Sequence, residues 1–176
     1  ATANTSNKMT ITAGSMTAYW RVWTGDPTGS VVKRVFVTAA TYWSGADFVS
    51  VAGADTKCQS LATAAALGGT WKAIISGATL ENNAAVNRVG YNWSELRTVT
   101  GTTVVYAPNL WKAATIPLLS PIVVNQNGTN SVDGSGVFTN TKADGNAYST
   151  ASDGSNCLDW TTSMTGYYPI SGVQSA

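Results

Sequence analysis

The chain of 176 residues contains no histidine and only two cysteines. Without histidine it has neither the base of Ser-His-Asp or Cys-His catalysis nor the commonest protein ligand of zinc. The cysteines, Cys58 and Cys157, stand about a hundred residues apart, which is not the short spacing of a zinc motif. The sequence therefore predicts neither a bound metal nor a cofactor.

Charged residues are also scarce, since they make up 11% of the chain and leave a net charge of +1. A nucleic-acid partner requires clustered lysines and arginines that meet its phosphates. The only adjacent basic pair, Lys33 and Arg34, lies inside an apparent strand. We therefore expect no nucleic-acid partner, and a surface made polar mainly by Thr, Ser, Asn and Gly.

No apolar run approaches the roughly 20 residues that cross a bilayer, so the sequence predicts no membrane span. The first residues, Ala-Thr-Ala-Asn, carry no basic segment and no apolar signal core, as at a mature end left by signal cleavage. We therefore expect an exported protein, extracellular or at the cell surface, after removal of a signal peptide.

Carboxylates are the remaining candidates for catalysis, since a spaced pair of Asp or Glu residues supports glycoside hydrolysis. The chain has nine of them, and no spacing singles out a pair. Asp133, Asp144 and Asp153 each precede a glycine in a turn context. We expect a protein that is not an enzyme, with a carboxylate-dependent, glycosidase-like enzyme as a second alternative.

The main helix is expected over about residues 54–67, with Asp55 in its first turn, where a carboxylate complements the helix dipole. Gly68 and Gly69 end it, and the apolar run 71–75 predicts a buried strand. One helical stripe forms its expected core face, made of Cys58, Leu61, Ala62, Ala65 and Ala66.

The first thirty residues are expected to form a strand extension of the main domain, which comprises residues 31–176. Met9, Ile11 and Ala13 alternate with threonines, and an aromatic run at 19–23 follows. This alternation predicts one or two strands, broken near a Gly-Ser pair.

The rest of the chain combines one strong helix with short strands and long loops, which is typical of a single α+β domain. A strand is expected at 104–106, and residues 125–146 are expected to be mostly loop, interrupted by Val137 and Phe138. Residues 82–93 indicate a short helical or irregular stretch.

Several motifs follow one another in a characteristic order. The strand VVKRVFVTAATYW precedes GADTKCQSLATAAALGGTWKAIIS, and PLLSPIVVNQNGT, VFTNTKADGNAY and CLDW come later. Over about residues 31–163, this series resembles endostatin and the bacterial endostatin-like outer-membrane lipoproteins, a branch of the C-type-lectin-like folds. The resemblance implies an endostatin-like fold. It carries over no zinc site, because the zinc site of endostatin relies on histidines.

The resemblance also implies a disulfide pattern that this chain cannot make. In the family, the cysteines that match Cys58 and Cys157 pair with two cysteines of a closing C-terminal segment, and both partners are missing here. The main domain is therefore expected to lack the usual closing strand and to leave a place in its sheet unfilled. The two cysteines either stay buried thiols or bond to each other, and export favours the disulfide.

Two arrangements fill that place. The N-terminal strands pair within their own chain, or a neighbouring copy donates them, which produces open-ended fibres. The residues expected to make such assembly contacts, or contacts with another protein, are Met9, Ile11, Ala13, Trp20, Trp23, Tyr167 and Tyr168.

We therefore expect a non-enzymatic cell-surface protein that acts through protein contacts. The favoured role is a self-assembling structural or adhesive subunit of a fibre or pilus, with strand exchange between copies of itself. The main alternative is a monomeric binding module, an adhesin for host matrix or serum proteins, as the resemblance to the lipoproteins implies.

Overall fold

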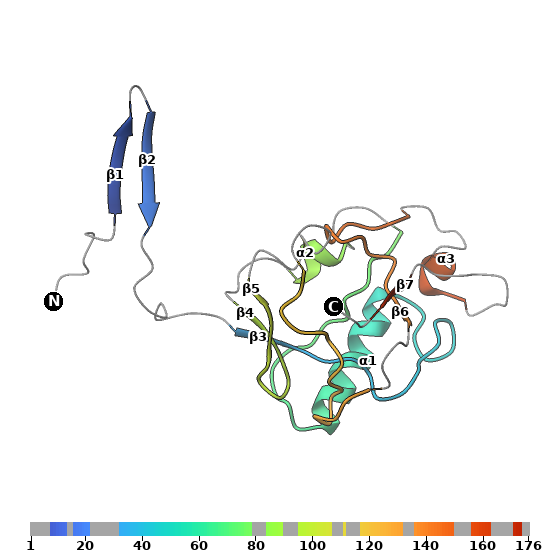
Figure 1. Ribbon diagram of the computed structural model, residues 1–176. Coiled ribbons are helices and arrows are strands. Elements are labelled where there is room, and N and C mark those ends of the chain that lie inside the picture. Colours follow the sequence, from blue (N-terminus) through green and yellow to red (C-terminus); the bar gives the residue numbers. More distant parts are fainter. Residues whose placement is uncertain are drawn as a thin grey trace. The chain divides into compact units, whose positions relative to one another are not determined.

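The computed structural model describes residues 8–13, 16–21, 32–78, 84–89, 95–106, 111, 117–131, 136–149, 156–162 and 171–173. The chain divides into two compact units, residues 1–30 and 31–176, and each is described by itself (Figure 1). Within the described ranges, none of the helices has both the length and the apolar content that a membrane crossing requires.

The first unit contains an antiparallel hairpin of β1 (Lys8–Ala13) and β2 (Met16–Arg21). The prediction of strands broken at the Gly-Ser pair is thereby confirmed, with two strands rather than one. Among the described strands, β1 and β2 pair only with each other and belong to no larger sheet.

The central element of the second unit is helix α1 (Val51–Ala64), which begins and ends three residues before the predicted helix. Ser50 is its N-cap, and the Ser50 hydroxyl accepts a hydrogen bond from the Gly53 N–H at 3.0 Å. At the other end Ala66 has a φ of 54° and stops the helix before the two glycines. Asp55 therefore lies in the second turn and does not act on the helix dipole as expected.

This shift also changes the buried face of α1. Val51 and Ala54 join Ala62 in the core, and Cys58 is partly buried beside them. Ala65 and Ala66 lie beyond the end of the helix, and Ala66 is exposed. The predicted stripe is therefore correct in its middle and wrong at its C-terminal end.

A three-stranded sheet lies on one side of α1, in the order β3-β4-β5 (Figure 1). β3 (Val32–Val35) runs parallel to β4 (Glu95–Thr98), and β5 (Thr103–Tyr106) runs antiparallel to β4. The strand over 104–106 is confirmed, whereas β4 was not predicted. The expected strand over 31–43 is shorter than predicted, because after β3 only an isolated bridge at residue 37 continues it.

Residues 71–78 run between two apolar clusters without forming a strand, which corrects the prediction of a strand at 71–75. Ala73 and Ile75 belong to one cluster, and Ile74 packs against the other. The first cluster also contains Val51, Ala54 and Trp160. The second contains Val35, Ala84, Ala85, Val86, Leu96, Val104, Val105 and Trp111. Packing against both clusters explains why Ala73, Ile74 and Ile75 are all apolar.

Side chains replace the hydrogen bonds that a neighbouring strand would supply to residues 71–78. N–H groups of the segment donate to side-chain oxygens, in the pairs Trp71 with Gln59 (2.9 Å), Ala73 with Asp55 (2.8 Å) and Ala78 with Asp159 (2.6 Å). Its carbonyls accept from side-chain nitrogens, in the pairs Ala73 with Arg88 (3.0 Å), Ile75 with Arg88 (2.7 Å) and Ser76 with Trp160 (2.9 Å). These bonds satisfy six backbone groups of the segment, and the Ser76 N–H donates to the Thr139 carbonyl, just after strand β6 (Gly136–Phe138), at 2.8 Å.

The other elements are short. Helix α2 (Ala85–Val89) lies in the stretch predicted to be helical or irregular, and β6 (Gly136–Phe138) lies where Val137 and Phe138 were expected to interrupt the loop. β6 pairs antiparallel with β7 (Ser171–Val173). β7 follows the CLDW motif but carries no cysteine and lies outside the three-stranded sheet, so the expected lack of the family's cysteine-bearing closing strand stays a prediction.

The last helical element, α3 (Cys157–Trp160), is a left-handed turn. All four of its residues have positive φ angles between 51° and 67°, a region that costs L-residues other than glycine roughly 1–2 kcal/mol each. Hydrogen bonds of Asp159 and Trp160 to the 71–78 segment hold this turn in place.

Candidate functional site

One face of the N-terminal hairpin brings together most of the predicted contact residues. The register pairs Met9 with Trp20 and Ile11 with Ala18, and it pairs Ala13 with Met16. Because directly paired residues of an antiparallel hairpin lie on the same face, these six residues share one wholly apolar face. We call it the apolar hairpin face.

The opposite face of the hairpin is polar. It consists of the pairs Lys8 with Arg21, Thr10 with Tyr19 and Thr12 with Thr17. Sequence reasoning identified the alternation in β1 but missed Met16 and Ala18. The Gly-Ser break in the sequence would have revealed them, since pairing across it fixes which residues of β2 lie opposite Met9, Ile11 and Ala13.

The other predicted contact residues, Trp23, Tyr167 and Tyr168, lie outside the described residues.

The edge of the three-stranded sheet is a second candidate surface, which sequence reasoning did not identify. β3 is a terminal strand of this sheet, and Val32 at its start is 42% exposed. Further along, the Phe36 and Trp71 rings lie 4.9 Å apart, and the Arg34 guanidinium lies 5.3 Å from the centre of the Trp71 ring. We call Val32, Arg34, Phe36 and Trp71, with the backbone of β3, the β3 edge.

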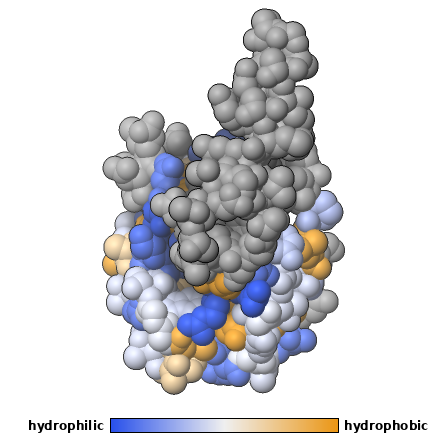
Figure 2. All heavy atoms as spheres, turned by 90° about the vertical axis from the view of Figure 1, so that its left-hand side faces the viewer, coloured by the Kyte–Doolittle hydropathy of each residue, from blue (hydrophilic) through white to orange (hydrophobic). Residues whose placement is uncertain are grey.

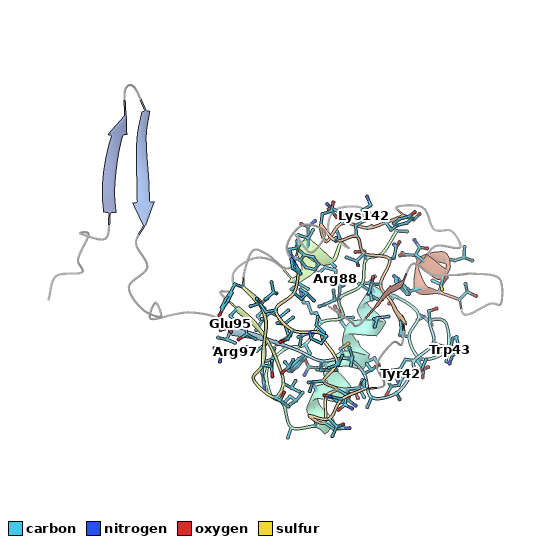
Figure 3. All side chains as sticks on the ribbon, viewed as in Figure 1. Tyr42, Trp43, Arg88, Glu95, Arg97 and Lys142 are labelled. Atoms are coloured by element: carbon cyan, nitrogen blue, oxygen red, sulfur yellow. The ribbon has the colours of Figure 1, made fainter. Side chains whose placement is uncertain are left out.

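Glu95 stands beside Val32 in the register of the sheet. Its carboxylate accepts hydrogen bonds from Arg97 at 2.7 Å and from the Thr103 hydroxyl (Figure 3). The hydrogen bond from Arg97, followed by that from Thr103, lowers the pKa of Glu95. Glu95 is therefore ionised and held in place, so it is poorly suited to act as a general acid.

A third surface is the loop that precedes α1, on the side of the unit away from Glu95 and Arg97 (Figure 3). Trp43 is 60% exposed and Val49 is 57% exposed. A tight turn holds Trp43, because its N–H donates to the Asp47 carboxylate at 2.8 Å and its carbonyl accepts from the Asp47 N–H at 2.8 Å. Lys57 lies 4.4 Å from the centre of the neighbouring Tyr42 ring.

Cys58 and Cys157 are free thiols, which corrects the disulfide predicted between them. Cys58 lies on α1 beside the cluster around Trp160, and burial, with a smaller contribution from the Asp55 carboxylate, raises its pKa to about 11. Cys157 is buried at the start of the left-handed turn. The Cys157 carbonyl accepts a hydrogen bond from the Thr162 N–H at 3.2 Å.

A shallow hollow of about 640 Å³ follows the exposed side of α1. Its lining residues are Asp55, Thr56, Gln59, Ser60, Thr63 and Ala64. The Asp55 carboxylate binds Arg88 and the Ala73 N–H, and Gln59 binds the Trp71 N–H. The polar groups of the hollow therefore serve the fold, which argues against a role in binding a ligand.

The described residues also offer no metal-binding group, since nowhere among them do three or more His, Cys, Asp or Glu side chains gather. In the amide-rich loop at 125–130, the Asn125 side-chain oxygen accepts from the Asn127 N–H at 2.9 Å and the Thr129 N–H at 3.3 Å. These bonds close the loop on itself.

Comparisons with protein-family models, with curated proteins and with solved structures give no match to this chain. The function must therefore be argued from the three surfaces described above.

Proposed function

We propose that the protein is a non-enzymatic, exported structural subunit that assembles with copies of itself through its N-terminal hairpin. The observation that carries this proposal is the apolar hairpin face, formed by all six residues on one side of β1 and β2. The expected export and the resemblance to endostatin-like surface proteins are parts of the same proposal.

The physical argument rests on the instability of an isolated hairpin. Two strands without a third strand or a covering layer are at best marginally stable in water. Burying a side chain such as Met, Ile or Trp contributes about 1.5–3 kcal/mol, so the apolar hairpin face gains strongly from any surface that covers it. Both outer edges of the hairpin also carry backbone groups that can extend a sheet.

The test is the size of the full chain in solution, measured by light scattering over a range of concentrations. Ile11→Lys places a charge on the apolar hairpin face, and Thr12→Lys places the same charge on the polar face of the same strand. We expect the parent and Thr12→Lys to assemble and Ile11→Lys to remain monomeric. A monomeric parent at all concentrations, or equal assembly of the two variants, would contradict the proposal.

The exposed Trp43 supports a second candidate function, a binding module for an extracellular protein. Trp and Tyr are among the residue types that most often dominate protein interfaces. Here a tight turn fixes the backbone of the exposed Trp43 before any partner binds. In this role, Trp43→Ala would weaken adhesion of the protein to a matrix-coated surface without changing its size in solution. Ile11→Lys would leave adhesion unchanged, so the two functions can be separated.

A further inference from the structure

We infer that Asn127 is a latent modification site, which loses its side-chain amide by deamidation once the turn built on Asn125 opens, and that conversion to isoaspartate then prevents the turn from closing again. The chain contains a single Asn-Gly pair, formed by Asn127 and Gly128. Asparagine followed by glycine is the most readily deamidated pair in proteins, because glycine has no side chain to shield its nitrogen.

The reaction needs only water and the backbone next to the side chain. The Gly128 nitrogen attacks Cγ of Asn127, so that a new N–C bond forms. The bond from Cγ to the amide nitrogen breaks, and ammonia leaves with the proton of the Gly128 N–H. Water then opens the resulting succinimide ring at either of its carbonyls. Opening at one carbonyl gives aspartate, and opening at the other gives isoaspartate, in which the backbone runs through the former side chain.

The pair is open to this chemistry from outside. Asn127 and Gly128 are both exposed, in a short loop whose ends are joined by a bridge between Val124 and Asn130. The only described atom within 4 Å of a Cβ at position 128 is Thr100 Cγ2, at 3.5 Å. The surface of this unit is mixed, with hydrophilic residues beside apolar ones on the face that Figure 2 shows. Water therefore reaches both the amide and the Gly128 nitrogen.

The turn nevertheless holds the attacking nitrogen in hydrogen bonds. The Gly128 N–H donates to the Asn125 carbonyl at 3.0 Å, and the Asn127 N–H donates to the Asn125 side-chain oxygen at 2.9 Å. The same oxygen accepts from the Thr129 N–H at 3.3 Å. Asn125 is only 5% exposed, so water competes poorly for these bonds. The proton that must leave is therefore engaged, and the backbone on both sides of Asn127 is fixed.

Conversion to isoaspartate changes the loop more than a new charge does. It adds one methylene to the backbone between Asn125 and Thr129, where the Asn125 N–H donates to the Thr129 carbonyl at 2.8 Å. The loop also holds the segment after β3, since the Gln126 side-chain oxygen accepts from the Ala39 N–H at 2.9 Å. A lengthened turn cannot keep all these bonds, so a loop that has opened and reacted does not close in its original form.

The first test follows the full parent chain at mildly alkaline pH, folded in buffer and unfolded in guanidinium chloride. Peptide mapping by mass spectrometry measures the share of chains that carry an acid at position 127. In the unfolded chain we expect Asn127 to convert before any other asparagine. In the folded protein it should convert about tenfold or more slowly, because the hydrogen bonds of the turn must break first. Equal rates in the two states, or earlier conversion elsewhere in the unfolded chain, would overturn the inference.

The second test compares Asn125→Ala with Gln126→Ala. Both are buried polar residues of the same loop, at exposed fractions of 5% and 8%, and the Asn125 side chain is the one that accepts from the Asn127 N–H. We expect Asn125→Ala to deamidate several-fold faster than the parent, and Gln126→Ala to match the parent, with circular dichroism checking that both are folded. Equal rates in the two variants contradict the role of Asn125. The first test needs no variant, so it decides the inference even if Asn125→Ala does not fold.

The third test separates the longer backbone from the new charge. Asn127→Asp carries the charge on an ordinary backbone, whereas the isoaspartate form, isolated from aged parent protein, carries the charge on the longer one. We expect Asn127→Asp to unfold at the same urea concentration as the parent, because position 127 is exposed, and the isoaspartate form to unfold at a lower one. Equal midpoints for the isoaspartate form and Asn127→Asp would mean that the turn closes after conversion, against the inference.

Discussion

The guanidinium of Arg88, on α2, pairs with the carboxylate of Asp55, on α1. Only 8% of the Arg88 side chain and 27% of the Asp55 side chain are exposed. The same guanidinium donates to two carbonyls of the 71–78 segment, and the same carboxylate accepts from an N–H of that segment. The ion pair therefore joins both helices to the segment that lies between the two apolar clusters.

Replacement of Arg88 by Met should lower the free energy of unfolding by about 3–5 kcal/mol, since it leaves a largely buried carboxylate and two carbonyls without their partner. Lys72→Met is the control, because Lys72 is exposed and its ammonium lies 3.4 Å from the Arg88 carbonyl. The control should change stability by at most about 0.5 kcal/mol. Urea unfolding measures both, and equal effects would contradict this role of Arg88.

Gly145 fits a buried turn that leaves no room for a side chain. Its φ is 82°, and a Cβ there would lie 2.6 Å from Trp111 Cε3 and 2.6 Å from Val86 Cβ. Gly69 has a similar φ of 79° and nothing within 4 Å of its Cβ position. Gly145→Ala should therefore destabilise the fold by about 1–3 kcal/mol more than Gly69→Ala, which measures the backbone effect alone. Thermal unfolding of the two variants would show this difference. Equal midpoints would contradict the steric overlap of a Cβ at position 145 with Trp111 and Val86.

At Leu158, whose φ and ψ are 51° and 55°, the left-handed turn predicts that a glycine variant is more stable than an alanine variant. This is the reverse of the usual order within a helix. Glycine adopts this conformation without the cost that alanine meets, so Leu158→Gly should be more stable than Leu158→Ala by about 1 kcal/mol. At exposed Ser60 in the middle of α1, the order should be the usual one, with alanine more stable by about 1 kcal/mol. Four urea unfolding curves test the prediction. Alanine more stable at both positions would rule out the left-handed turn.

The raised pKa of Cys58 predicts a loss of stability in alkali. The thiol ionises near pH 9.0 when unfolded and near pH 11 when folded, so between these values the folded protein holds a proton that the unfolded chain has lost. The thiol therefore stabilises the fold fully below pH 9 and loses this contribution as the pH rises to 11, by about 1 kcal/mol per pH unit. Measuring the free energy of unfolding of the parent and of Cys58→Ala at each pH, and taking the difference, separates the contribution of this thiol from that of other titrating groups. A difference that is independent of pH would contradict the burial of the thiol.

Local patterns in the sequence predicted the hairpin and the existence of the main helix. Alternation and the Gly-Ser break are sufficient for β1 and β2, because their partners are adjacent in the chain. The start of α1 was also accessible, since Ser50 is a typical N-cap residue three positions before Gly53. The apolar spacing and the glycine pair led instead to a helix placed three residues too late.

The 71–78 segment shows why the rest could not be predicted. Its apolar run has the composition of a core strand, and the sequence does not reveal that its partners are the side chains of Asp55, Arg88 and Asp159. The β3 edge was missed for a related reason. Whether Val32 lies at an open edge depends on which strand pairs beside it, and β4 is some sixty residues further along the chain.

The hydrogen bonds of the 71–78 segment also constrain the order in which the chain can fold. Their partners lie from 12 to 84 positions away in sequence, and the most distant, Trp160, belongs to the left-handed turn. Contacts of such long separation form late, since much of the chain must be ordered before they close. The second unit thus completes its core only when α1, α2 and the turn at 157–160 have all come together.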